Sequence, residues 1–141
     1  MNIVAFIPAK GTSERVPDKN LAVLDGDYLF KRKLRQALDC PAITEVCLDT
    51  ESDALADLAT DLPITRLSRP ASLASNATAG HEMFAWECSQ RPDADIWIQI
   101  LCTAPFVSAA TISRAIEALL ADPEADSLVA VSRAKQYCWD G

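Results

Sequence analysis

The chain has 141 residues, half of them hydrophobic, with 13 Lys and Arg against 20 Asp and Glu. This length predicts one domain, residues 1–141, with enough apolar side chains to build a core. The net charge of −7 argues against a general nucleic-acid-binding surface, so an anionic ligand needs a local cationic pocket. No apolar stretch has the length of a membrane span, and the first residues lack the pattern of a signal peptide.

The five cysteines are scattered, no CxxC occurs, and there is a single histidine. This usage argues against a zinc site and predicts free thiols. Free thiols are typical of reducing compartments, so we expect a cytoplasmic protein with neither nucleic acid nor membrane as a partner.

Strand-length apolar runs alternate with helical patterns along the whole chain. In order, the spacing predicts a strand over 2–7, a helix over 28–38, a strand over 45–48, a helix over 52–59, a strand over 64–67, a helix over 78–89, a strand over 96–101, a helix over 108–120 and a strand over 128–131. Ser52 and Ser108 stand where two of the helices begin, as N-caps. This alternation predicts a three-layer, Rossmann-like α/β fold with a mostly parallel sheet of about five strands.

In such sheets ligands bind beyond the carboxyl ends of the strands, where the strand order reverses. The loops after the first and fourth strands are therefore the first candidates for a site. Asp49 ends the second strand nearby, and we expect it to pair with a cation or orient a loop rather than bind a metal. The cationic run of Lys31, Arg32, Lys33 and Arg35 is expected on a solvated helix face.

The loop over residues 7–20 reads IPAKGTSERVPDKN, and its composition suits phosphate binding. Its candidate ligand groups are the cations Lys10, Arg15 and Lys19, the backbone at Gly11, and the hydroxyls of Thr12 and Ser13. Glycine permits close approach of a ligand, and successive backbone N–H groups can form an anion nest. The loop is not a Walker A loop, because the second glycine and the Gly-Lys-Ser/Thr ending are missing. Composition alone also fits an ordinary solvated connection.

Five segments in order resemble the motifs of the sugar-acid cytidylyltransferases, above all the N-acylneuraminate (sialic acid) type. The loop string PAKGTSERVPDKNL is similar to the family signature P-A-R-x-x-S-K-x-x-x-x-K-N. The other segments are LDTES at 48–52, SRPASLASNATAG at 68–80, ILCTAPFVS at 100–108 and ADSLVAVSR at 125–133. Only the first is specific alone, but the ordered set covers nearly the whole chain.

The resemblance implies that a sugar-acid hydroxyl attacks the α-phosphate of CTP, forming a CMP-sugar and releasing pyrophosphate, with Mg²⁺ as cofactor. Such transfers depend on in-line positioning and on stabilisation of negative charge. Lys10 and Lys19 are the implied catalytic cations on the triphosphate. The implied substrate-binding positions are Ala9, Gly11, Thr12, Ser13, Arg15, Asn20, Arg69, Thr78, Gly80, Gln99 and Thr103.

Three of these positions have a structural alternative. Arg69 either frames the nucleotide or forms a salt bridge at a strand end. Thr78 either frames the nucleotide or caps a helix. Arg15 has no family counterpart, and it either reaches the pyrophosphate or is a surface charge.

The chain also departs from the family pattern. Lys10 replaces an arginine, which keeps the charge but loses the bidentate fork. Leu101 and Val107 stand where the family has Gln and Arg, which leaves the acceptor and the use of CTP open. Gln99, two residues earlier on the same strand face, and Thr103 are candidate substitutes. The octulosonate branch carries an acidic metal ligand in this loop, and its absence disfavours that branch.

The family continues beyond this length with acceptor contacts, a dimerisation segment and two metal-binding aspartates. The fold is therefore expected to be incomplete at its C-terminus, with a homodimer and protein metal ligands expected only in a longer chain. Whether the chain is a portion of a longer enzyme or naturally short stays open. The alternatives to a cytidylyltransferase are a non-catalytic nucleotide-binding domain and a nucleotidyltransferase for another sugar.

Overall fold

The computed structural model describes residues 1–12, 16–75 and 77–133. Its elements in chain order are β1 (Ile3–Pro8), η1 (Lys19–Leu21), β2 (Val23–Leu24), β3 (Asp27–Tyr28), α1 (Leu29–Leu38), β4 (Glu45–Thr50), α2 (Asp53–Leu58), β5 (Thr65–Ser68), η2 (Ala71–Leu73), α3 (Gly80–Ser89), β6 (Ile96–Gln99) and α4 (Ala109–Ala121). The predicted caps are confirmed, because the hydroxyl of Ser52 accepts from Leu55 N–H and that of Ser108 from Thr111 N–H.

The main sheet has the strand order β5-β4-β1-β6, and all of its pairs are parallel. The chain runs outward from β1 through β4 to β5 and then returns to β6 on the other side of β1. The order therefore reverses between β1 and β6, which are the first and fourth strands of this sheet in the order of the chain. The predicted α/β class and the predicted switch point are both confirmed.

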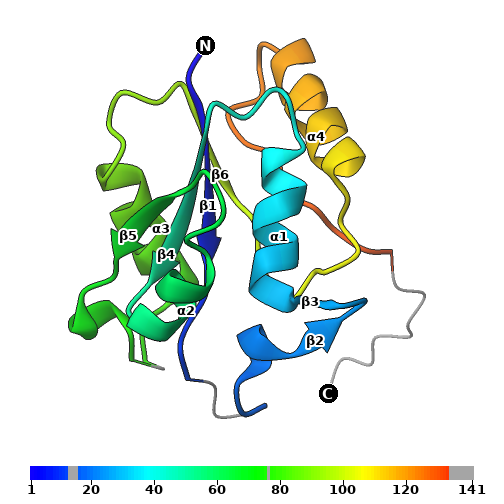
Figure 1. The fold of residues 1–141 in the computed structure, drawn as a ribbon. Helices are drawn as coiled ribbons and strands as arrows, with labels where there is room; N and C mark the ends of the chain where they lie inside the picture. Colours follow the sequence, from blue (N-terminus) through cyan, green and yellow to red (C-terminus); the bar gives the residue numbers. More distant parts are fainter. Residues whose placement is uncertain (13–15, 76, 134–141) are drawn as a thin grey trace, which may run out of the picture.

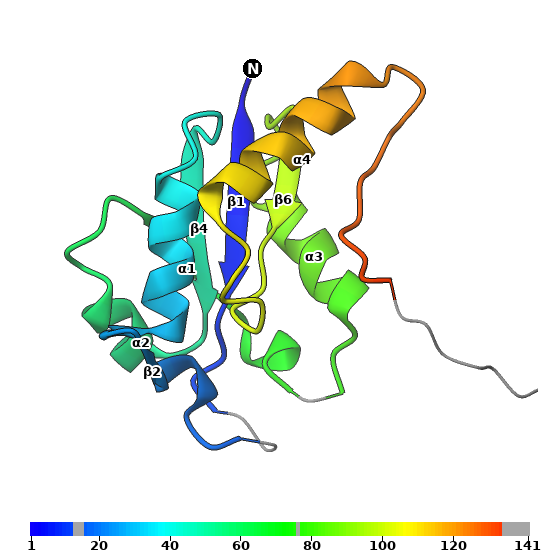
Figure 2. The ribbon, with the colours of Figure 1, turned by 90° about the vertical axis from the view of Figure 1, so that its right-hand side faces the viewer.

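Helices cover both faces of this sheet, with α1 and α4 on one side and α3 on the other (Figures 1 and 2). Side chains of β1 alternate between these two layers because successive residues of a strand point to opposite faces. Ile3, Ala5 and Ile7 join the cluster beneath α1, α2 and α4. Val4 and Phe6 join the cluster beneath α3. The first strand is thus buried on both faces, as its continuous apolar run predicts.

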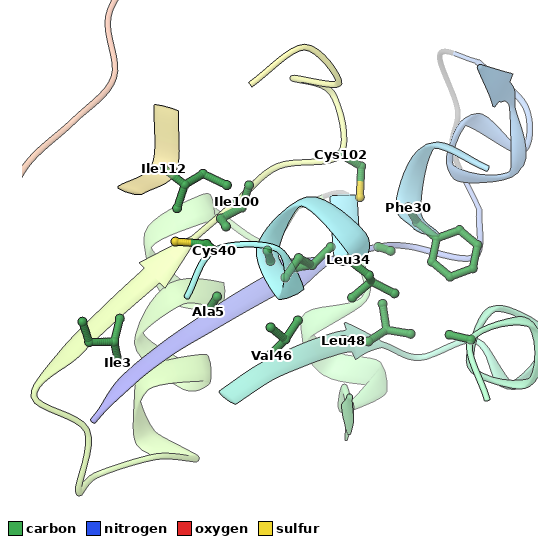
Figure 3. Packing of buried hydrophobic residues seen from close by; sticks show 14 of the residues in the cluster. Ile3, Ala5, Phe30, Leu34, Cys40, Val46, Leu48, Ile100, Cys102 and Ile112 are labelled. Carbon is green, nitrogen blue, oxygen red and sulfur yellow. The ribbon is translucent and has the colours of Figure 1, made fainter. Parts of the chain in front are cut away.

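Figure 3 shows Leu34 of α1 and Ile112 of α4 lying over the β1 face that carries Ile3 and Ala5. These four side chains are all nearly inaccessible to solvent. Burying each aliphatic side chain of the size of leucine is worth about 1.5–3 kcal/mol. This apolar layer fixes the sheet and thereby the position of the loops at its carboxyl end.

Residues 128–131 do not form the predicted fifth strand. Leu128, Val129 and Val131 are 45%, 79% and 87% exposed. A parallel strand is normally covered on both faces, and burial of its side chains offsets the entropy lost on ordering. These side chains reach no apolar layer in the part of the chain that the structure describes. The prediction of a strand over 128–131 is wrong, and within the described residues the main sheet has four strands.

A short hairpin, β2 paired antiparallel with β3, precedes α1 and was not predicted. Its turn contains Asp25 at φ 53° and Gly26 at φ 78°. Two successive residues with positive φ are typical of the Asp-Gly turns that join tight hairpins. The hairpin leads directly into α1, which begins at Leu29.

Candidate nucleotide site

The loops that follow β1, β5 and β6 gather at the carboxyl end of the parallel sheet (Figures 1 and 2). The strand order reverses between β1 and β6 at this same edge. Ligands of open α/β sheets bind at such a place. The structure therefore brings the signature loop, the segment after Ser68 and the segment after Gln99 to one end of the fold.

The signature loop begins tightly packed against the turn between β4 and α2. Ala9 is fully buried, and its N–H donates to the carbonyl of Asp49 at 2.9 Å. Gly11 N–H donates to Glu51 Oε1 at 2.9 Å. A Cβ atom on Gly11 would lie only 2.7 Å from Ser52 Cβ, so this position requires glycine for close approach of two backbone segments. The Gly11 N–H is already bonded within the protein, and an anion nest must use later N–H groups.

Asn20 ties the far end of the loop back to its start. It is 6% exposed, and its Nδ2 donates to the carbonyl of Lys10 at 2.8 Å. Lys10 and Lys19 thereby stand at the two ends of a closed loop, while Thr12 is exposed. The predicted contacts of Ser13 and Arg15 lie outside the described residues.

Arg69 and Asp49 form a buried ion pair at the ends of β5 and β4. Arg69 Nη2 donates to Asp49 Oδ2 at 2.7 Å and Nε to Oδ1 at 3.0 Å, and the two side chains are 1% and 0% exposed. The expectation that Asp49 pairs with a cation is confirmed. For Arg69 the structure shows the strand-end salt bridge, and a direct contact with the nucleotide stays a prediction.

Glu87 of α3 adds a second carboxyl group to this buried region. Gln99 Nε2 donates to its Oε2 at 2.6 Å. Burial, followed by a hydrogen bond with Asp49, raises the pKa of Glu87 to about 8, so this group carries a proton at neutral pH. The amide of Gln99 is engaged inside the fold, and its predicted role toward the acceptor remains a prediction.

Lys33 is fully buried, and its placement on a solvated face is wrong. Its Nζ donates to Gln36 Oε1 at 2.6 Å, to the carbonyl of Ala104 at 2.6 Å and to that of Val107 at 3.1 Å. Burial lowers the pKa of this ammonium group. Lys33 therefore fastens the loop after β6, which carries the exposed Thr103, onto α1.

Thr78 does not cap α3, so that alternative is wrong. The N-cap is Ala79, whose N–H donates to Glu82 Oε2 at 2.8 Å. The hydroxyl of Thr78 instead lies 3.2 Å from Ser75 Oγ. Gly80 is the first residue of α3, and a Cβ atom at this position would meet nothing within 4 Å. The predicted nucleotide contacts of Thr78 and Gly80 stay predictions.

The residues at this edge do not build a metal site of their own. Among the described residues, no group of three or more His, Cys, Asp or Glu could hold an ion. Asp49 is committed to Arg69, and Glu87 is protonated near neutral pH. Burial raises the pKa of the Cys102 thiol to about 11, so this cysteine is no nucleophile at neutral pH. None of the helices in residues 1–12, 16–75 and 77–133 is long and apolar enough to cross a membrane.

Sequence reasoning missed Glu51, Glu87 and the buried position of Lys33. Two of the three carried a periodic signal, because Glu87 follows Phe84 by three residues and Lys33 follows Phe30 by three. Residues three or four apart share one face of a helix, so both charges stood on apolar faces. Glu51 carried no such local signal, since its partner Gly11 is 40 residues away.

Comparisons with known proteins agree with this geometry. A family model described as cytidylyltransferase matches residues 4–137. The 3-deoxy-manno-octulosonate cytidylyltransferase of Chlorobium chlorochromatii is 30% identical over 131 residues, which are 92% of this chain and 51% of the relative. The Chlorobium limicola enzyme of the same name is 33% identical over 132 residues, with the same coverage. The chain thus spans about half the length of these curated relatives.

A shorter match links the chain to another sugar acid. The CMP-N,N'-diacetyllegionaminic acid synthase of Legionella pneumophila is 37% identical over 59 residues, which are 42% of this chain and 25% of the relative. The octulosonate relatives match over more of the chain, although the loop after β6 lacks the acidic residue expected of that branch.

Solved structures show the same fold. A CMP:2-keto-3-deoxy-manno-octonic acid synthetase complexed with CTP superposes with a TM-score of 0.72 at 18% identity, over 88% of this chain and 49% of that one. A Mycobacterium tuberculosis protein solved with manganese gives a TM-score of 0.59 at 18% identity, over 83% and 59%. With nearly all of its length matched by the family model, the chain belongs to the cytidylyltransferase family.

Proposed function

We propose that the protein transfers CMP from CTP to a sugar acid and releases pyrophosphate. The observation that carries this proposal is the signature loop, closed by the Asn20–Lys10 hydrogen bond and placed beside the strand-order reversal. The loop puts one cation, Lys10, at its start and another, Lys19, at its end. Cations fixed around a transferring phosphate stabilise the charge that spreads in the transition state.

In this mechanism the chain's own residues bind and orient the reactants. Lys10 and Lys19 attract the triphosphate, and N–H groups of the loop beyond Gly11 donate to its oxygens. The loop after β6, fastened by Lys33, borders the place for the acceptor. The family resemblance implies Mg²⁺ as cofactor, but the described residues do not offer a set of ligands that fits it.

For the acceptor we propose a 2-keto-3-deoxy sugar acid, with 3-deoxy-manno-octulosonate placed before sialic acid. The support is the name of two relatives, each of which matches 92% of this chain. Leu101, 48% exposed, stands where the sialic acid type has Gln, which also weighs against that acceptor. The resemblance to the cytidylyltransferase family also leads us to propose a homodimer for the whole protein.

The test is pyrophosphate release from CTP and Mg²⁺ with octulosonate, sialic acid and legionaminic acid in parallel. Turnover with octulosonate above the other two supports the proposal, and turnover with sialic acid alone would reverse the order of acceptors. Calorimetric titration with the four nucleoside triphosphates tests the nucleotide independently. Equal affinity for purine and pyrimidine triphosphates would remove the cytidine assignment.

A second candidate function is nucleotide binding without transfer. The exposed apolar side chain of Leu101 favours it, since a leucine cannot make the hydrogen bonds of the family's Gln. Tight CTP binding without pyrophosphate release for any acid of the panel would select this function over the enzyme.

A further inference from the structure

Glu51 links the signature loop to the buried centre of the sheet edge. It lies in the turn between β4 and α2, and its Oε1 accepts the Gly11 N–H at 2.9 Å. Its Oε2 lies 4.0 Å from Arg69 Nη1 and makes no hydrogen bond within the described residues. One carboxylate therefore contacts the loop with one oxygen and faces a buried guanidinium with the other.

The Arg69 side of this link is rigid. Its guanidinium donates to both carboxylate oxygens of Asp49 and also to the Asp49 carbonyl at 3.1 Å. A bidentate pair of this kind fixes the plane of the guanidinium. Because Arg69 is immobilised by Asp49, its remaining nitrogen offers Glu51 a fixed positive partner.

The loop side is held at two points. Ala9 N–H donates to the Asp49 carbonyl, a backbone bond that every residue other than proline could make at position 9. Gly11 N–H donates to a side chain, which a substitution can remove. The close contact of Gly11 with Ser52 shows that the two segments touch with no room for a Cβ atom.

We propose that Glu51 is a positioning residue of the nucleotide loop, latching Gly11 to the Arg69–Asp49 pair. The latch sets the path of the backbone on both sides of Gly11 and hence the direction in which Lys10 leaves it. Arg69 then acts on the loop through Glu51. The existence of the latch is independent of the ligand, while its effect on CTP binding rests on the proposed function.

The contact between Glu51 and Gly11 N–H also has an alternative interpretation, which predicts the opposite effect on CTP binding. A carboxylate on a loop N–H is a stand-in for a phosphate oxygen, and it would then have to leave before CTP binds. Removal of Glu51 would tighten CTP binding in that case. It weakens CTP binding if the carboxylate preorganises the loop, because the apparent dissociation constant is divided by the fraction of molecules in the competent state.

The experiment compares Glu51→Ala and Glu51→Gln with the wild type and with Glu117→Ala, a control on the exposed surface of α4. Amide exchange of Gly11, followed by NMR in ligand-free protein, reports the latch itself. Calorimetry with CTP and Mg²⁺ reports its effect on binding, and thermal melting shows that each variant is folded.

In Glu51→Ala we expect Gly11 exchange to accelerate about tenfold and CTP to bind about tenfold more weakly, as when only a tenth of the molecules hold the loop in its binding-competent conformation. Glu51→Gln should fall between, because its amide oxygen still accepts from Gly11 but faces Arg69 without charge. The control should match the wild type in both measurements. A folded Glu51→Ala variant with unchanged Gly11 exchange, or with equal or tighter CTP binding, overturns the proposal.

Failure of the proposed function gives a different result. In that case wild-type protein shows no CTP binding, while Gly11 exchange still separates Glu51→Ala from the control. Unchanged Gly11 exchange together with normal CTP binding by the wild type would instead reject the latch and leave the nucleotide site standing.

Discussion

Replacing Lys33 with methionine tests how firmly the loop after β6 is held. Methionine keeps most of the length and apolar contact of the lysine stem, but it removes the charge and all three donated hydrogen bonds. The change is informative because Lys33 is the one link that joins two carbonyls of this loop, Ala104 and Val107, to α1 through a single atom.

The expected cost follows from what the three acceptors have left. The Ala104 carbonyl still accepts from Val107 N–H at 3.2 Å, and Gln36 still donates to the Pro105 carbonyl at 3.0 Å. The Val107 carbonyl and Gln36 Oε1, both partly buried, lose the hydrogen bond that they accept from Lys33, and a buried acceptor without a partner costs about 1–3 kcal/mol. Relief of the desolvation of the ammonium group offsets part of this. We expect a net loss of about 1–2 kcal/mol in the free energy of unfolding.

Urea denaturation at pH 7 measures this loss. The matched control is Lys31→Met on the same helix, whose ion pair with the exposed Asp61 should contribute little to stability because solvent screens it. Because burial lowers the pKa of Lys33 from 10.5, the unfolded state holds more protons just below pH 10.5. The deficit of Lys33→Met should therefore grow as the pH rises through that range. A variant as stable as the wild type, or a deficit no larger than that of the control, would refute the role of Lys33 as a clamp.

Three further changes have definite expected outcomes. Lys19→Ala should weaken CTP binding by about 1–3 kcal/mol, the range of a charge-assisted hydrogen bond, with little change in melting temperature; unchanged affinity with a lower melting temperature would make the loop purely structural. Gly11→Ala should lower the free energy of unfolding by about 1–3 kcal/mol, measured by urea denaturation, because its Cβ would lie 2.7 Å from Ser52 Cβ. Glu87, with a pKa raised from 4.5 to about 8, binds more protons in the folded state between these values, so stability should fall as the pH rises from about 5 to 8. Glu87→Gln should flatten that fall in denaturation curves recorded across the range, and an unchanged slope would contradict it.

The elements that depend on periodic apolar spacing were predictable from the sequence. The run before Pro8 gave β1, and the spacing of Phe30, Leu34 and Ala37 gave α1, since both patterns bury one continuous surface. The alternation of strands and helices predicts the class of fold, but it does not predict the complete order of the strands in the sheet. The loops after the first and fourth strands were expected at the point of reversal, and the order β5-β4-β1-β6 confirms this.

Segments whose partners lie far away in sequence were not predictable in the same way. Residues 128–131 have strand-like composition, but no described neighbour covers them, and composition does not report coverage. The Arg69–Asp49 pair joins residues 20 apart. Both of its members could be named as candidates for a salt bridge, yet only the parallel register that sets Asp49 beside Leu67 makes them meet.

The charges at this edge explain how a loop proposed to bind a triphosphate can lie above three carboxyl groups. Asp49 is neutralised by Arg69, and Glu87 is neutral because it holds its proton. Glu51 accepts from Gly11 N–H with one oxygen and faces the second side of the same guanidinium with the other. Arg69 thus compensates two carboxylates at once. A single buried arginine, which need not contact the nucleotide, is in this way a condition for an attractive site.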